Sequence, residues 1–150
     1  MVVGLVIAPF LYADQPGVDN PNRASFNYMM NCQGCHGPSG QGTFDGSVPR
    51  MENFVGNFLL VEGGREFIVR VPGSANSDLD DAELAELLNW MLPRISSNEM
   101  PAGFAPYTAA EVGRLRSQPL EAVVETRTGL VRQMQASGLE VPPDQLPADY

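Results

Sequence analysis

Both cysteines and the only histidine of this 150-residue chain fall in one pentapeptide, Cys32-Gln33-Gly34-Cys35-His36. Two cysteines this close together cannot build a disulfide framework, which needs more of them. A zinc site normally takes four nitrogen or sulfur ligands, so two cysteines and one histidine are one ligand short. A thioredoxin-like redox pair would need a preceding βα pattern, and the residues before Cys32 are predicted to be helical. The C-x-x-C-H spacing is instead the attachment signature of haem c.

The spacing of this pentapeptide has a mechanical reason. The thiols of Cys32 and Cys35 would add to the two vinyl groups on one edge of the porphyrin. His36 would then lie beneath the ring with an imidazole nitrogen on the iron. We therefore expect one covalent haem c, attached at Cys32 and Cys35, with His36 as an axial ligand of the metal.

The charge of the chain narrows the range of partners that it can bind. The chain has 18 acidic and 9 basic residues, a formal net charge of −9, and every basic residue is arginine. Binding of nucleic acid needs concentrated positive charge, which this chain lacks. An acidic surface, made more acidic by haem propionates, predicts redox partners with a basic docking face.

Residues 2–13 form an apolar run that fits the core of a signal peptide. The run is too short to cross a bilayer, which takes about 20 residues, so no stable membrane span is expected. Ala13, with Leu11 two residues before it, makes an acceptable cleavage site, although no Lys or Arg precedes the run. We expect residues 1–13 to be a signal peptide and the protein to be exported to the periplasm.

Helical periodicity recurs along the rest of the chain, and no stretch alternates convincingly as a strand would. Helices are predicted at about 23–31, 80–92, 108–116 and 120–137. The short apolar stretch 65–71 suits a helix or a strand, and residues 37–50, rich in Gly, Pro and Ser, suit a loop. The expected class is all-α.

Individual residues set the expected helix ends and faces. Asn22 would cap the first helix, in which Phe26 and Met30 share one face at i, i+4 spacing, with Met30 toward the core. Pro93 would stop the second helix. A capping box, Thr108-x-x-Glu111, would open the third.

From Arg23 to about Arg116 the chain resembles the class I c-type cytochromes. The resemblance is carried by Tyr28 four residues before Cys32, by the glycines of His36-Gly-Pro-Ser-Gly-Gln-Gly, and by Pro49-Arg50-Met51, which is similar to a Pro-x-Leu element. It implies a cytochrome c-like helical domain over residues 14–118 and assigns to the Pro49 carbonyl a hydrogen bond from the axial histidine. Residues 119–150 would be an extra C-terminal helix and an irregular tail.

The resemblance leaves one alignment open. The family usually carries an aromatic residue on its closing helix, packed against the first helix. The predicted helix 108–116 has none, whereas Trp90 lies in the helix at 80–92. In an alternative alignment, that earlier helix closes the domain.

The sixth iron ligand is constrained by what the chain lacks. His36 is the only histidine and there is no lysine, so methionine or an open, weakly ligated iron remain. Met100 is favoured because it lies in an inter-helix loop and is followed by Pro101, which resembles the family's ligand loop. Met51, on the proximal side in the Pro-x-Leu comparison, and the helical Met91 are the alternatives.

An iron closed on both faces suits electron transfer rather than catalysis, so no catalytic residue is expected. We expect a periplasmic carrier that passes single electrons from a dehydrogenase to an oxidase or another cytochrome. One alternative is a dedicated haem subunit of one periplasmic dehydrogenase complex. Another is a haem-based binder of small ligands with an open iron. Peroxidase chemistry is disfavoured because no second histidine is present for distal acid–base work.

Overall fold

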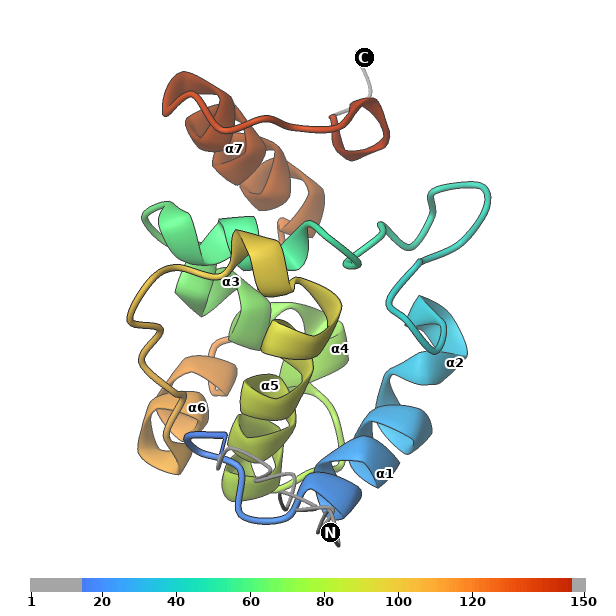
Figure 1. Ribbon diagram of the computed structural model, residues 1–150, viewed down its shortest axis with the longest axis vertical. Coiled ribbons are helices and arrows are strands. Elements are labelled where there is room, and N and C mark those ends of the chain that lie inside the picture. Colours follow the sequence, from blue (N-terminus) through green and yellow to red (C-terminus); the bar gives the residue numbers. More distant parts are fainter. Residues whose placement is uncertain (1–14, 147–150) are drawn as a thin grey trace, which may run out of the picture.

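The computed structural model describes residues 15–146, which form helices and connecting loops without any strand (Figure 1). The expected all-α class is therefore confirmed. The elements in chain order are α1 (Pro21–Asn31), α2 (Gln33–His36), η1 (Val55–Leu60), α3 (Gly64–Arg70), α4 (Pro72–Ala75), α5 (Asp81–Ile95), η2 (Ser97–Glu99), α6 (Ala109–Arg116), α7 (Val123–Ala136) and η3 (Pro143–Gln145). The predicted signal peptide, residues 1–13, lies outside the described residues. Within them, no helix has the length and apolar character needed to cross a membrane.

Helix α1 begins earlier than predicted and turns a different face to the core. Asn20, not Asn22, is the N-cap, and its side chain accepts a hydrogen bond from the Arg23 N–H at 3.0 Å. Pro21 suits the first helical position because no N–H is needed there. Ala24 and Tyr28 are buried, whereas Phe26 is 56% and Met30 64% exposed, so placing Met30 toward the core was wrong.

Helix α5 is the longest element and opens on a full capping box. The Asp80 side chain accepts from the Glu83 N–H at 2.8 Å, and the Glu83 side chain accepts from the Asp80 N–H at 3.1 Å. The helix continues through Pro93 to Ile95, contrary to the predicted stop. Proline cannot donate to the Asn89 carbonyl one turn back. The Gln15 side chain donates to that carbonyl instead, at 2.5 Å, which satisfies the group that Pro93 leaves free.

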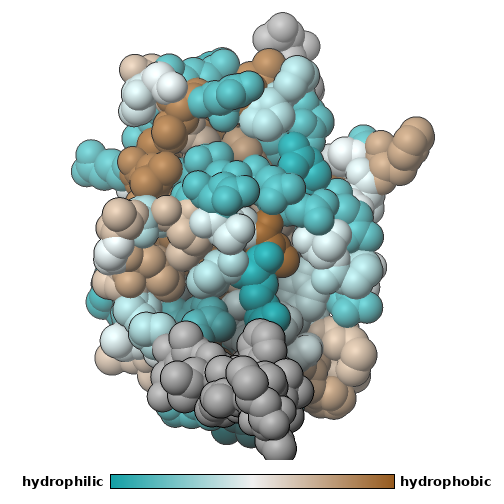
Figure 2. All heavy atoms as spheres, in the orientation of Figure 1, coloured by the Kyte–Doolittle hydropathy of each residue, from teal (hydrophilic) through white to brown (hydrophobic). Residues whose placement is uncertain are grey.

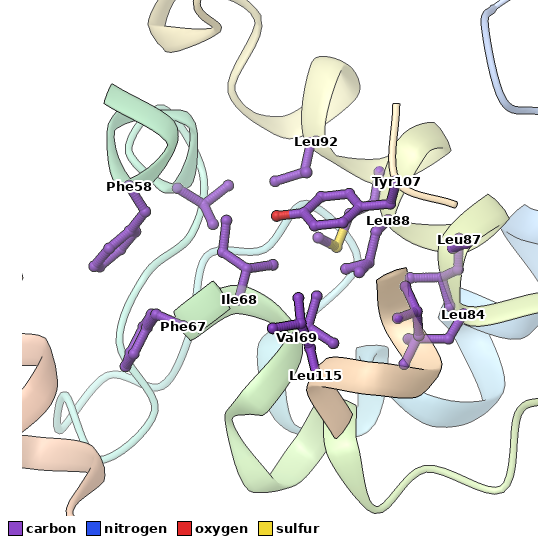
Figure 3. Close-up of a cluster of buried hydrophobic side chains, with 14 of the residues drawn as sticks. Phe58, Phe67, Ile68, Val69, Leu84, Leu87, Leu88, Leu92, Tyr107 and Leu115 are labelled. Atoms are coloured by element: carbon purple, nitrogen blue, oxygen red, sulfur yellow. The ribbon is translucent and has the colours of Figure 1, made fainter. Parts of the chain in front are cut away.

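The core is built around α5, which packs against α1 on one side and α6 on the other. Figure 3 shows leucines of α5 meeting Ile68 and Val69 of α3, with Tyr107 and Leu115 beside them. Across the α1–α5 contact, the Tyr28 and Trp90 rings lie 6.1 Å apart, centroid to centroid. The aromatic pair between a first and a closing helix is thus made by α5, which favours the alternative alignment.

Helix α7 folds back onto the rest of the molecule. It packs against η1 and α3, and Leu130, Val131 and Met134 join the main core. The following tail is fastened by Arg50, whose guanidinium donates to both carboxylate oxygens of Asp144, at 2.9 and 3.1 Å. The C-terminal extension therefore shares its core with the preceding helices.

Candidate functional site

A cavity of about 300 Å³ opens between α2 and the bodies of α3, α4 and α5. Most of its lining is apolar and comes from η1, α3, α5 and α7, including Val55, Phe58, Ile68, Leu88 and Val123. Cys32, Cys35 and His36 all line it, and so does Pro49. The structure therefore gathers the predicted attachment residues around one apolar hollow.

The pentapeptide forms a single helical turn, which explains how its three side chains share a wall. Cys32 ends α1, donating its N–H to the Tyr28 carbonyl at 2.9 Å, and the His36 N–H donates to the Cys32 carbonyl at 2.9 Å. This i, i+4 relation stacks Cys32 and His36 on one side of the turn. Gly37, with a φ of +77°, then ends the turn in a conformation that favours glycine.

The glycine-rich loop after His36 brings Pro49 and its neighbours back to the pentapeptide. The Gly42 N–H donates to the His36 carbonyl at 2.9 Å, and the Met51 N–H donates to the Gly40 carbonyl at 2.7 Å. Gly42 has a φ of +73°, and a Cβ there would lie 2.9 Å from the Arg50 nitrogen. The Tyr28 hydroxyl also donates to the Gly37 carbonyl at 2.8 Å, which ties the loop to α1.

Burial shapes the protonation of the site. Burial, and to a lesser degree the charge of Cys35, raises the pKa of the Cys32 thiol to about 11. Burial lowers the pKa of His36, so the neutral imidazole that a metal requires is favoured. Within the described residues the buried His36 Nδ1 has no hydrogen-bond partner, and the bond predicted from His36 to the Pro49 carbonyl stays a prediction.

These residues fit a covalent haem. Two free thiols and a half-buried imidazole line one side of a cavity whose remaining walls are mostly apolar. A haem would supply the apolar surface that such walls pack against, and its iron would take an imidazole nitrogen. The donor set and the cavity thus agree with the chemistry of the C-x-x-C-H pattern.

Two arginines at the cavity were not predicted from the sequence to belong to the site. Arg50 and Arg127 both line it. Arg127 donates to the Gln145 carbonyl at 3.2 Å and to its side-chain oxygen at 2.6 Å, and burial lowers its pKa. Arg127 lies four residues before Val131 on the buried side of α7, so the helical spacing carried a signal for it.

The three methionines considered as iron ligands do not all lie at the cavity. Met51 and Met91 line the cavity, whereas Met100, the predicted sixth ligand, is not among its lining residues. Met100 follows η2, and the backbone carbonyl of the preceding Glu99 lies against Gly56 of η1, 2.9 Å from where a Cβ on that glycine would stand. The assignment of Met100 stays a prediction.

The curated proteins that match this chain are cytochromes of one kind. No protein-family model matches the chain. The chain is 33% identical over 107 residues to cytochrome c-552 of Thermus thermophilus, a match that covers 59% of this chain and 81% of the relative. A second cytochrome c-552, from a specified strain of the same organism, matches at the same identity and is covered to 72%.

These relatives, the helical fold and the C-x-x-C-H turn point to haem c as cofactor and electron transport as role. The alignment is 107 positions long, but only 59% of the 150 residues of this chain fall within it. The remaining aligned positions are residues that the relatives have and this chain lacks. The chain belongs to the class I c-type cytochromes.

Proposed function

We propose that this cytochrome holds one haem c covalently through Cys32 and Cys35, with His36 as the proximal iron ligand, and carries single electrons between periplasmic redox proteins. The observation that carries the proposal is the convergence of these three side chains on one apolar cavity. When bound, the haem supplies a reversible one-electron couple. The chain supplies attachment, orientation and a dry environment.

Attachment and orientation follow from the single turn of α2. Each thiol would form one thioether bond by addition across a vinyl group, with the thiol proton going to the vinyl carbon, so no oxidant is needed. The neutral His36, held in the turn by the Cys32 carbonyl, would present a ring nitrogen to the metal. The loop tied to Gly40 and Gly42 would keep Pro49 near that ring, where its carbonyl can accept the remaining N–H.

Arg127 would meet a haem propionate, whereas Arg50 is already paired with Asp144. Arg127 reaches the cavity from α7 and has an amide, not a carboxylate, as its hydrogen-bond partner. A half-buried guanidinium gains from an anionic partner, and propionate carboxylates are the anions that haem brings. The predicted boundary at residue 118 stays a prediction, but this role would make the extension 119–150 part of the haem site.

Docking would use the surface beside the exposed Cys35. Phe26, Met29 and Met30 of α1 are 56%, 49% and 64% exposed, and residues 21–36 contain no acidic side chain. Figure 2 shows apolar atoms at the lower right, over α1. A small apolar contact suits a transient encounter, while the net charge of −9 would steer a partner with a basic face from a distance. A periplasmic dehydrogenase as donor and an oxidase or cytochrome as acceptor would fit, with residues 1–13 directing export.

The test of the cofactor is chemical. Denatured protein purified from the periplasm should keep its colour through acid–acetone extraction, and its mass should exceed that of the apo chain by one haem. Cys35→Ala should leave at most one thioether and lower the yield of holoprotein, whereas Ser39→Ala, in the loop beyond the turn, should mature normally. If the haem of the natural protein extracts into acetone, covalent attachment is refuted.

A further inference from the structure

The cavity has a wall opposite the pentapeptide, formed by the segment between α3 and α5. Figure 1 shows α4 lying across from α2, and α4 packs against α3 and α6. Gly73, Ser74 and Ser77 of this segment line the same cavity as His36. If His36 binds the iron from α2, this wall would lie on the other side of a haem held in the cavity.

The residues of that wall are unusual for a haem protein whose iron is ligated on both faces. Residues 71–80, Val-Pro-Gly-Ser-Ala-Asn-Ser-Asp-Leu-Asp, contain no methionine, histidine, lysine or cysteine. Their cavity-lining groups are two serines, one glycine and apolar side chains, and neutral hydroxyls are weak partners for a haem iron compared with thioether or imidazole. No strong ligand therefore faces His36 from this side.

The wall is also fastened in place. Arg116 of α6 donates to the carbonyls of Ala75, Ser77 and Leu79 at 3.0, 2.6 and 2.6 Å. Helix α5 begins directly afterwards on the Asp80 capping box. These bonds hold the segment against α6.

The methionines at the cavity come from other walls. Met51 belongs to the loop tied to Gly40, on the same side as His36, and two ligands on one side cannot occupy opposite axial positions. Met91 lies on α5, the helix packed against α1, and is 4% exposed within the core. Neither belongs to the wall that faces His36.

We propose that this cytochrome leaves the sixth position of its haem open to a small neutral ligand such as carbon monoxide or nitric oxide, with Gly73, Ser74 and Ser77 as the distal wall. The proposal rests on haem attachment at Cys32, Cys35 and His36. Gly73 has open space where a Cβ would stand. Ser77 already donates its hydroxyl to the Ser74 carbonyl at 2.9 Å, which leaves the Ser74 hydroxyl to donate to a bound ligand.

Carbon monoxide titration of the dithionite-reduced holoprotein tests the proposal, after extraction has established covalent haem in the same sample. We expect a saturable shift of the Soret band and no methionine–iron charge-transfer band in the oxidised protein. Ser74→Ala should raise the C–O stretching frequency by removing a donor, while Ser39→Ala should leave it unchanged. Met51→Leu, Met91→Leu and Met100→Leu should each leave carbon monoxide binding in place.

The outcomes separate this proposal from the cofactor assignment. Covalent haem that shows the methionine–iron band and does not bind carbon monoxide would overturn the open site alone, and the methionine variant that loses the band would name the ligand. Haem that extracts into acetone would overturn the attachment instead. Binding of carbon monoxide with a C–O frequency unmoved by Ser74→Ala would remove Ser74 from the site and retain the open position.

Discussion

Glu86 is a buried carboxylate that holds the start of α1 onto α5. Its side chain is 5% exposed. One oxygen accepts from the backbone N–H groups of Asp19 and Asn20, at 2.9 and 2.8 Å, and the other accepts from Arg23 Nε at 2.7 Å. Since Asn20 is the N-cap of α1, this carboxylate anchors the helix that leads directly into the turn formed by Cys32 to His36.

Glu86→Gln tests the strength of that anchor. The glutamine amide keeps one acceptor oxygen, but its NH₂ group replaces the second oxygen and cannot accept a hydrogen bond from Arg23 or from the backbone N–H groups. Hydrogen bonds to a charged group contribute about 1.5–3 kcal/mol each, although the 46% exposure of Arg23 lets solvent weaken its part of the interaction. We expect a loss of about 3 kcal/mol in the free energy of unfolding at pH 7, measured by urea denaturation. Glu121→Gln removes the same charge from an exposed site and should cost less than about 0.5 kcal/mol.

The pH dependence supplies a second check on Glu86. Burial alone would raise the pKa of Glu86, but the Arg23 hydrogen bond and the backbone N–H groups outweigh it and hold the pKa below its ordinary value. A carboxyl with a lowered folded-state pKa adds stability above its unfolded pKa and loses it as pH falls. The difference between natural protein and Glu86→Gln should therefore be full at pH 7 and shrink below about pH 4. A difference that is absent at pH 7, or equally large at low pH, would refute this account.

Two further predictions concern the extension and the docking surface. Met134 of α7 is fully buried, so Met134→Ala should lower the urea unfolding free energy by about 2–5 kcal/mol, while Val124→Ala, at a 59% exposed position, should change it by less than about 0.5 kcal/mol; equal effects would mean that α7 does not share the core. Met30→Ser should slow reduction of a lysine-rich cytochrome c in stopped-flow experiments, whereas Val124→Ser should not. The natural rate should also fall as ionic strength rises, and a flat or rising rate would show that the acidic charge does not steer the encounter.

Local signals in the sequence predicted the features that depend on neighbouring residues. The C-x-x-C-H pattern could be recognised because it occupies five consecutive residues. Thr108 caps α6 as predicted, accepting from the Glu111 N–H at 3.2 Å. The Glu111 side chain, however, pairs with Arg65 at 2.6 Å instead of returning to the cap, because the fold brings a guanidinium from α3 within reach.

Features that depend on distant partners were decided by the tertiary structure. Phe26 and Tyr28 are both aromatic residues on α1, and only the position of α5 determines that Tyr28 is buried and Phe26 exposed. Pro93 stays inside a helix because Gln15, far away in sequence, satisfies the carbonyl that proline cannot serve.

The same distinction applies to the cavity that we propose holds the haem. Cys32, Cys35 and His36 were predicted from the sequence to hold a haem because the C-x-x-C-H pattern lies within five consecutive residues. The opposite wall is built from α4 and Ser77, held by Arg116 of α6, and nothing local in Gly73, Ser74 or Ser77 marks them as lining the same cavity as His36. The sequence thus predicted the cofactor and the residues that would attach it, whereas the packing of α3, α4 and α6 determined what lies across the cavity, because a wall is defined only by the elements that face it.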